Sequence, residues 1–146
     1  MAAQPYQWGW PNAGAVNQTC IGLCPDYQLQ FQEDELGSGL FDPLTSIITI
    51  NESGLYQLGL QAEFTGNGHI EGMLSIRVNG LSVSESNYTD NSWSLRRRGV
   101  VSDLHRLEVG DQIEYHTLVY VGQAAALSTL VTSGLRTFAF GNKVAP

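Results

Sequence analysis

The sequence is short of charge: charged residues make up 14% of its 146 positions, about half the usual share in globular proteins. Basic residues are the scarcer kind, with 7 Lys and Arg against 14 Asp and Glu, and the formal net charge is −7. A chain of this sign repels the phosphate backbone of DNA and RNA. The composition therefore argues against nucleic acid as a partner.

Long apolar runs are also missing. No stretch approaches the roughly 18 consecutive apolar residues of a transmembrane helix. Neither the basic nor the apolar segment of a secretion signal precedes Pro5. The sequence therefore predicts a chain that is made in a cytoplasm and has no membrane partner.

Residues able to bind metal or to carry catalysis are few and scattered. The only two cysteines, Cys20 and Cys24, have no second Cys/His cluster with which to complete a metal site. Free thiols and a local disulfide both remain open. The three histidines, His69, His105 and His116, stand in unrelated contexts, and no hydrolase motif accompanies them. We expect no enzyme activity, no catalytic residue, no cofactor and no metal.

Two acidic stretches, residues 33–35 and 85–91, gather oxygen ligands. The first of them lacks the alternating spacing of a calcium loop. Solvated loops are the simpler interpretation of both, and a calcium site is the alternative.

What the sequence does contain is a series of short β patterns. The 16 glycines and 5 prolines mark many turns, and between them apolar and polar residues alternate with the two-residue period of a half-buried strand. Candidate strands cover residues 27–32, 45–50, 54–64, 73–80, 93–107, 111–121, 127–134 and 136–144. Asn79-Gly80 is a strong hairpin signal, residues 85–92 are expected to form a loop, and no convincing helix occurs. About eight to ten such strands predict an all-β sandwich or barrel.

Four stretches, taken in order, resemble the jelly roll of the tumour necrosis factor and complement C1q superfamily. They are ITINESGLYQLGLQAEF, LSIRVNG, HRLEVGDQIEYHTLVY and FAFGNKV. The matching positions are a Gly-x-Tyr, an Asn-Gly turn, a Leu-x-x-Gly-Asp turn and two aromatics of the last strand: Gly54, Tyr56, Asn79, Gly80, Leu107, Gly110, Asp111, Phe138 and Phe140. Bacterial spore-surface proteins and several phage surface proteins carry heads of this kind. The resemblance implies an antiparallel jelly-roll sandwich over residues 26–146.

The same resemblance implies a compact homotrimer. Its interface would be formed by aromatic and aliphatic strand residues, for which the candidates are Tyr56, Tyr115, Leu118, Tyr120, Phe138 and Phe140. Each of them is also compatible with the core of a single sandwich.

Residues 1–25 have no sustained period, and we interpret them as an extended N-terminal arm. Tyr6, Trp8 and Trp10 would lie on one side of an extended segment, and aromatic side chains are effective interface anchors. We expect the arm to bind a partner through these rings. Folding of the arm back onto its own head is the alternative.

Arg96, Arg97 and Arg98 form a basic run in an otherwise acidic chain. One interpretation is a solvated edge strand that charge protects from aggregation. The other is a contact with an acidic neighbouring subunit. In that case the three arginines, like the aromatic residues of the arm, are candidate partner contacts.

Two functional hypotheses follow. The first is a structural virion protein, a trimeric decoration (cement) protein on the outer surface of a bacteriophage capsid. It would be made in the host cytoplasm and would bind several major capsid protein subunits at once. The second is a spore-surface or secreted C1q-like head that recognises carbohydrate or a receptor through its apical loops.

Overall fold

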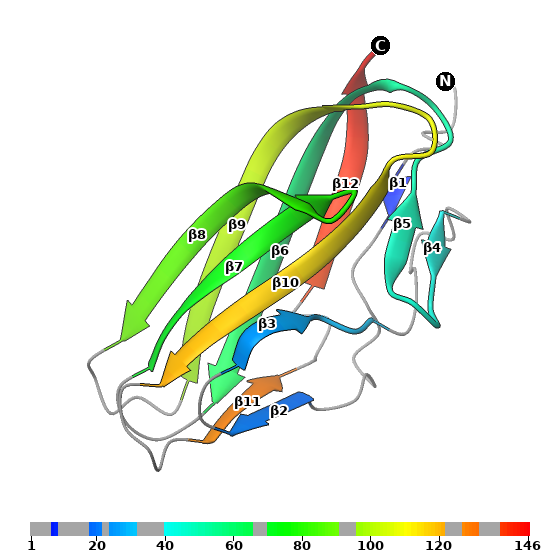
Figure 1. Ribbon diagram of the computed structural model, residues 1–146. Coiled ribbons are helices and arrows are strands. Elements are labelled where there is room, and N and C mark those ends of the chain that lie inside the picture. The colour runs from blue at the N-terminus through cyan, green and yellow to red at the C-terminus, as the bar shows by residue number, and fades with distance from the viewer. Residues whose placement is uncertain are drawn as a thin grey trace.

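The computed structural model describes residues 7–8, 18–21, 24–31, 40–65, 70–90, 96–121, 127–131 and 138–146. Side chains are described for residues 28–31, 40–62, 72–87, 99–118 and 139–146. All twelve elements of the described residues are strands, and they form two antiparallel sheets packed as a sandwich (Figure 1). Over the same residues, no helix is long and apolar enough to span a membrane.

Sheet A is built around β6 (Gly54–Thr65). One side of β6 pairs along its whole length with β9 (Arg96–Leu107). The other side pairs first with β12 (Phe138–Ala145) and then with β11 (Leu127–Val131). Two short strands extend the sheet beyond these: β1 (Gln7–Trp8) pairs with β12, and β2 (Gln18–Ile21) pairs with β11.

Sheet B is built around β10 (Gln112–Val121). One side of β10 pairs with β7 (Ile70–Val78), which forms a hairpin with β8 (Leu81–Asp90). The other side of β10 pairs with two short strands, β5 (Ile47–Thr49) and β3 (Cys24–Gln28). The last strand of the sheet, β4 (Phe41–Asp42), pairs with β5.

The core lies between the sheets because apolar side chains occupy the inward phase of each strand. In β6, Leu58 and Leu60 are fully buried whereas Gln57 between Tyr56 and Leu58 is exposed. Each fully buried leucine contributes about 2 kcal/mol. The buried apolar residues are Leu29, Phe31, Leu40, Ile48, Ile50, Tyr56, Leu58, Leu60, Ala62, Leu74, Ile76, Val78, Val101, Leu107, Ile113, Tyr115 and Ala139. The predicted all-β antiparallel sandwich is confirmed.

β8 corrects the prediction that residues 85–92 form a loop. The strand runs to Asp90 and pairs with β7 throughout. It is polar because it lies at the edge of sheet B, where side chains such as Glu85 and Asn87 are exposed. Backbone pairing, which a side-chain pattern does not report, makes this stretch a strand.

The turn before β8 agrees with the sequence. Asn79 and Gly80 have φ angles of 52° and 81°. Positive φ at both central residues is the geometry of the tight hairpin that Asn-Gly favours. The β7–β8 hairpin predicted from this dipeptide is therefore confirmed.

The N-terminal segment contributes backbone to both sheets. β1 and β2 extend sheet A, and β3 belongs to sheet B. Trp8 pairs with Gly141 of β12, which is the arrangement expected of an arm that returns to its own head. The division of the chain after residue 25 into an arm and a domain stays a prediction.

Residues 29–31, which follow β3, pack against Tyr115 in the core and hydrogen-bond to the β4–β5 turn. The Tyr115 hydroxyl donates to the carbonyl of Phe140 on the opposite sheet (3.1 Å). The Tyr115 ring meets Phe31 edge-on, with centroids 6.1 Å apart and an interplanar angle of 88°. The hydroxyl of Ser46, which is fully buried, accepts from the backbone N of Phe31 (2.9 Å). Tyr115 thus connects β10 to β12, and Phe31 connects the segment after β3 to both β10 and the β4–β5 turn.

β12 lies so close to the start of β6 that residue 54 has no room for a side chain. The Gly54→Ala variant tests this requirement for glycine. An added Cβ would lie 2.6 Å from the carbonyl O of Ala145 and 2.4 Å from Cε of Lys143. The lysine can move aside, but the backbone cannot. We expect the free energy of unfolding in urea to fall by about 3 kcal/mol.

Gly80→Ala is the matched control. Its φ of +81° strains an alanine, yet no atom lies within 4 Å of the added Cβ. The loss should therefore be smaller, about 1 kcal/mol. Equal losses in the two variants would contradict the role of close packing at Gly54.

Candidate functional site

Two turns at one end of the sandwich are joined by a pair of side chains. Asn79, in the β7–β8 turn, donates from Nδ2 to Oδ1 of Asp111, at the end of the β9–β10 turn (2.8 Å). Its Oδ1 accepts from the backbone N of Gln112 (3.0 Å), and its own backbone N donates to the carbonyl of Gln112 (2.8 Å). The Asn-Gly and Gly-Asp motifs of the sequence are therefore parts of one contact.

Asp111 also holds the β9–β10 turn closed and connects it to the chain before β6. Its Oδ2 accepts from the backbone N of Glu108 (2.8 Å), and its carbonyl accepts from the backbone N of Ile50 (2.9 Å). The carbonyl of Ile50 accepts from the backbone N of Gly110 (2.7 Å). We call the three connections joined in this way, residues 50–53, 79–80 and 108–111, the turn cluster.

Apolar side chains project from the turn cluster into solvent. Leu81, directly after the β7–β8 turn, is 73% exposed, and Val109 in the β9–β10 turn is 66% exposed. Because hydrogen bonds hold these turns in place, a partner that covered the two side chains would have little backbone to order. The turn cluster is therefore one candidate contact surface.

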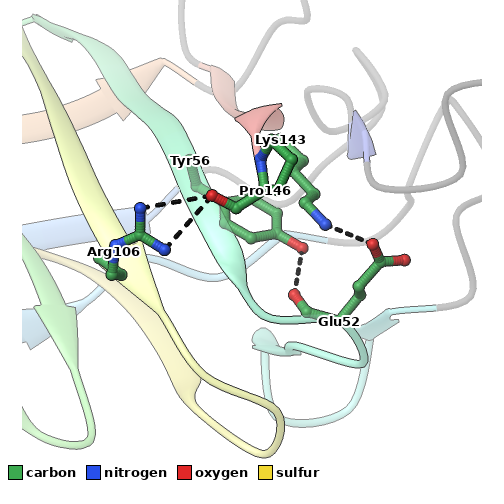
Figure 2. Close-up of polar contacts among 5 residues, drawn as sticks. All are labelled: Glu52, Tyr56, Arg106, Lys143 and Pro146. Atoms are coloured by element: carbon green, nitrogen blue, oxygen red, sulfur yellow. Dashed lines mark hydrogen bonds and ion pairs between the residues drawn. The ribbon is translucent and has the colours of Figure 1, made fainter.

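A second polar group lies where β6, β9 and β12 meet at the same end (Figure 2). Lys143 Nζ forms an ion pair with Glu52 Oε1, and the Tyr56 hydroxyl donates to the Glu52 carbonyl (2.7 Å). Both Nη atoms of Arg106 donate to Pro146 O (3.3 Å each). Burial, together with the charge of Glu52, raises the pKa of the Tyr56 phenol, which keeps its proton and its role as donor. This group fastens the last strand to sheet A.

The outer face of sheet A has no charged residue in its three central rows. β9 alternates across this sheet: Val101 is buried, whereas Val100 and Leu104 are 54% and 57% exposed. The register aligns the rows Val100–Gln61–Phe138, Ser102–Gly59–Phe140 and Leu104–Gln57–Asn142 across β9, β6 and β12. We call these positions the sheet A face. An exposed uncharged area on a chain of net charge −7 is a candidate protein contact.

Phe140 shapes the middle of the sheet A face. A Cβ at Gly59 would lie 2.2 Å from Cζ of the Phe140 ring, so the far edge of the ring lies directly over the bare backbone of Gly59. The ring stays partly exposed. Gly59 thereby lets an aromatic side chain lie low on the sheet, where a partner surface can pack against it.

The outer face of sheet B has a different character, with polar contacts in place of an apolar area. His116 and Glu114 are joined through Nε2 and Oε2 (2.7 Å). The Ser75 and Ser82 hydroxyls bond to each other (2.9 Å), and Ser82 donates to Glu85 (2.8 Å). Ser75 is fully buried, so its hydroxyl cannot meet a substrate. Ser82 and Glu85 are exposed, and the absence of enzyme activity stays an expectation.

No metal centre is visible in the described part of the chain. No group of three or more His, Cys, Asp or Glu side chains is placed there to hold a metal ion. Of the two acidic stretches considered for calcium, residues 33–35 lie outside the described residues, and most of residues 85–91 belong to β8. The expectation of no metal and no cofactor stays untested.

Two of the predicted trimer-interface residues belong to the core of one subunit. Tyr56 and Tyr115 are both 0% exposed, because each falls on the inward phase of its strand. Neither can touch a second subunit, and the alternative of sandwich core applies to both. Leu118 is partly buried on the outer face of sheet B, and Phe140 lies on the sheet A face. The side chains of Tyr120 and Phe138 lie outside the described ones.

The predicted partner contacts are described only in part. Tyr6 and Trp10 lie outside the described residues, and Trp8 is described by its backbone in β1. Arg96, Arg97 and Arg98 open β9, opposite residues 63–65 of β6, and their side chains lie outside the described ones. The binding roles of the arm and of the three arginines stay predictions.

Sequence reasoning missed Val100 and Leu104. Val100 and Val101 are adjacent in a strand, so one of them must face outward, and Leu104 shares the phase of Val100. The shared phase of Val100 and Leu104 could have indicated an apolar outer face, although basic residues precede and follow them in the strand. The bond between Asn79 and Asp111 had no such signal, since 32 positions separate them.

Comparisons with known proteins identify the fold. No protein-family model and no curated protein sequence matches the chain. Its structure is similar to Eiger TNF from S. frugiperda, with a TM-score of 0.69 and 10% identity over 96% of this chain and 92% of that one. It is also similar to murine APRIL, with TM-scores of 0.62 at pH 8.5 and 0.57 at pH 5.0, at 15% and 14% identity, over 95% of this chain and 98% of the other. The TNF-like jelly roll that the sequence resemblance implied is confirmed.

Asp111→Ala tests the contact that joins the turn cluster. The variant loses the acceptors of Asn79 Nδ2 and of the Glu108 backbone N, and we expect the free energy of unfolding in urea to fall by about 2–3 kcal/mol. Asn79→Ala should cost about 1–2 kcal/mol. The double variant should lose less than the sum, because both changes remove one shared contact.

Asp42→Ala is the control for removal of a turn aspartate. Its carboxylate accepts from the Leu44 backbone N inside its own turn (2.9 Å), so we expect a smaller cost of about 1 kcal/mol. Strictly additive losses at residues 79 and 111 would show that the two side chains act independently.

Proposed function

We propose that the chain forms a homotrimeric surface head that acts by binding. The observation that carries this proposal is the sheet A face, where Val100, Leu104 and Phe140 are exposed or partly exposed with no charged residue among them. Single exposed apolar residues are common on soluble proteins, but their alignment in an uncharged area is typical of a contact surface. The TNF-like fold supports the same assembly.

Three copies related by a rotation axis would cover this surface in a closed ring. In a closed ring each subunit buries both of its contact surfaces, whereas an open arrangement would leave one contact surface exposed at each end. The edge formed by β8 and β9 is the natural partner for the sheet A face, because it leaves β6 and β12 accessible. The turn clusters of the three subunits would then project from the same end of the assembly.

In its most specific form, the proposal is a decoration (cement) protein on the outer surface of a bacteriophage capsid. The candidates for contact with major capsid protein subunits are Tyr6, Trp8 and Trp10 of the arm, together with Arg96–Arg98. β1 attaches the backbone of Trp8 to β12 at the border of the sheet A face. A trimer would carry three arms, so that weak contacts add up through avidity.

A second candidate function is a spore-surface or secreted head that recognises carbohydrate or a receptor. The turn cluster favours it, because Leu81 and Val109 are exposed on turns that the contact between Asn79 and Asp111 holds together. In this case the binding surface would be the end of the trimer, and the arm would be dispensable. Neither function requires an enzyme activity or a cofactor.

Leu104→Glu tests the trimer. Placing an unpaired carboxylate in the centre of a buried interface costs several kcal/mol, so we expect the subunits to associate at least about 100-fold more weakly. Light scattering after size exclusion should show a trimer for the unchanged protein and a folded monomer for the variant.

Leu44→Glu is the matched control, since Leu44 is 90% exposed in the β4–β5 turn, away from the sheet A face. It should remain trimeric. A monomeric unchanged protein, or loss of the trimer in both variants, would overturn the proposed interface.

Replacement of Tyr6, Trp8 and Trp10 by alanine separates the two functions. The change keeps the chain length and the backbone of β1, and we expect the trimer to remain while sedimentation with assembled capsids falls at least about tenfold. Undiminished capsid binding would remove the arm from the proposal. Glycan-array binding that survives this change and is lost with Leu81→Ser/Val109→Ser would favour the second function.

A further inference from the structure

The β7–β8 turn carries a chemically labile dipeptide. In an Asn-Gly pair the backbone N of the glycine can attack the side-chain amide carbon of the asparagine, because glycine has no side chain to hinder the approach. Gly80 is exposed, and apart from its chain neighbours no atom lies within 4 Å of a Cβ added there. Asn79 and Gly80 therefore have both the sequence and the open surroundings of a deamidation site.

The side-chain amide of Asn79 is engaged at both of its polar atoms by the chain at the start of β10. Nδ2 donates to Asp111 Oδ1 (2.8 Å), and Oδ1 accepts from the backbone N of Gln112 (3.0 Å). The backbone N of Asn79 donates to the carbonyl of Gln112 (2.8 Å). Rotation of the amide toward the backbone N of Gly80 breaks both side-chain bonds. The contact between the two turns therefore opposes the attack.

We propose that Asn79-Gly80 is a latent deamidation site, which the contact with Asp111 keeps unreactive in the folded protein. The site reacts when the turn cluster opens locally, because the amide is then free to turn toward Gly80. A hydrogen bond to an ionised acceptor is strong enough to suppress the open state about 10- to 100-fold. The contact therefore sets the rate of the reaction.

The covalent steps need only water. The backbone N of Gly80 bonds to Cγ of Asn79 and the bond from Cγ to Nδ2 breaks, so that Nδ2 leaves as ammonia with the proton of the Gly80 amide. Water then opens the cyclic imide at one of its two carbonyl carbons. One opening leaves a side-chain carboxylate on the original backbone, and the other leads the backbone through the former side chain. In sum, amide and water give acid and ammonia, and nothing is oxidised or reduced.

Neither product can re-form the original contact. In the direct product a carboxylate oxygen replaces the Nδ2 donor and faces Asp111 Oδ1, so that two acceptors of like charge meet. The rearranged product adds an atom to the backbone of a tight turn. Deamidation therefore separates the two turns irreversibly. An effect on binding through Leu81 and Val109 rests on the proposed function of the turn cluster, whereas the reaction itself does not.

The test follows deamidation by peptide mapping with mass spectrometry, in water enriched in heavy oxygen so that only newly formed acids are labelled. Asn79 should react at least about tenfold more slowly in the folded protein than in the chain unfolded by urea. Asn67-Gly68, the other Asn-Gly pair of the sequence, is the reference in urea and should react at a similar rate to Asn79 there. Equal rates at Asn79 in the two states, or an Asn79 that stays intact in urea while Asn67 reacts, would overturn the proposal.

Variants separate local opening from global unfolding. Asp111→Ala removes the acceptor of Asn79 Nδ2 and should speed the reaction of the folded protein at least about tenfold. Gly54→Ala is the matched control, because it destabilises the fold at a site without contact to Asn79. Its rate should stay within about twofold of the unchanged protein, since local opening governs the reaction. Equal acceleration in both variants would overturn the role of the contact.

A milder variant decides the matter where Asp111→Ala folds poorly, as judged by circular dichroism. Asp111→Asn keeps the shape of the side chain and offers a neutral, weaker acceptor, so the rate at Asn79 should rise about threefold or more. An unchanged rate would contradict the proposal. Asn79→Asp reproduces the direct product and should lower the melting temperature by at least about 3 °C. An unchanged melting temperature would show that the turns stay joined after deamidation and would overturn the irreversible separation.

Discussion

The carboxylate of Asp111 is the contact on which the arrangement of the connections depends. It accepts hydrogen bonds from Asn79 in the β7–β8 hairpin of sheet B and from Glu108 in the turn that leads from sheet A to sheet B. The backbone of the same residue accepts from Ile50, just before the chain returns to sheet A. Bonds to an ionised acceptor are among the stronger ones. The side chain and the backbone carbonyl of Asp111 together therefore join two sheet crossings and one hairpin.

The two ends of the sandwich differ in their connections. At the turn cluster, hydrogen bonds join the connections and leave Leu81 and Val109 exposed. At the other end, the crossing between β2 and β3 places Cys20 and Cys24 on opposite sheets. The proposed trimer needs the sheet A face to be in place before the subunits meet, because an interface that forms without rearrangement has less conformational entropy to lose.

Much of the fold could be predicted from side-chain phase. Leu58 and Leu60 alternate with polar or small residues, and the Asn79-Gly80 pair specifies the hairpin that follows β7. The method failed at residues 85–90 of β8, where polar side chains give no apolar alternation and the expected loop is a strand. It also left open whether Tyr56 and Tyr115 lie in the core or at an interface, because either place selects large aromatic residues.

The sequence by itself determined the all-β class, the positions of most strands and the shortage of charge, because a two-residue period and composition are local properties. Only the tertiary structure decided that Tyr56 and Tyr115 are internal, that Val100 and Leu104 share an uncharged face with Phe140, and that Asn79 bonds to Asp111. The physical reason is that these relations depend on strand register and on the order of strands in each sheet. Pairing between distant segments sets both, and no local pattern records it.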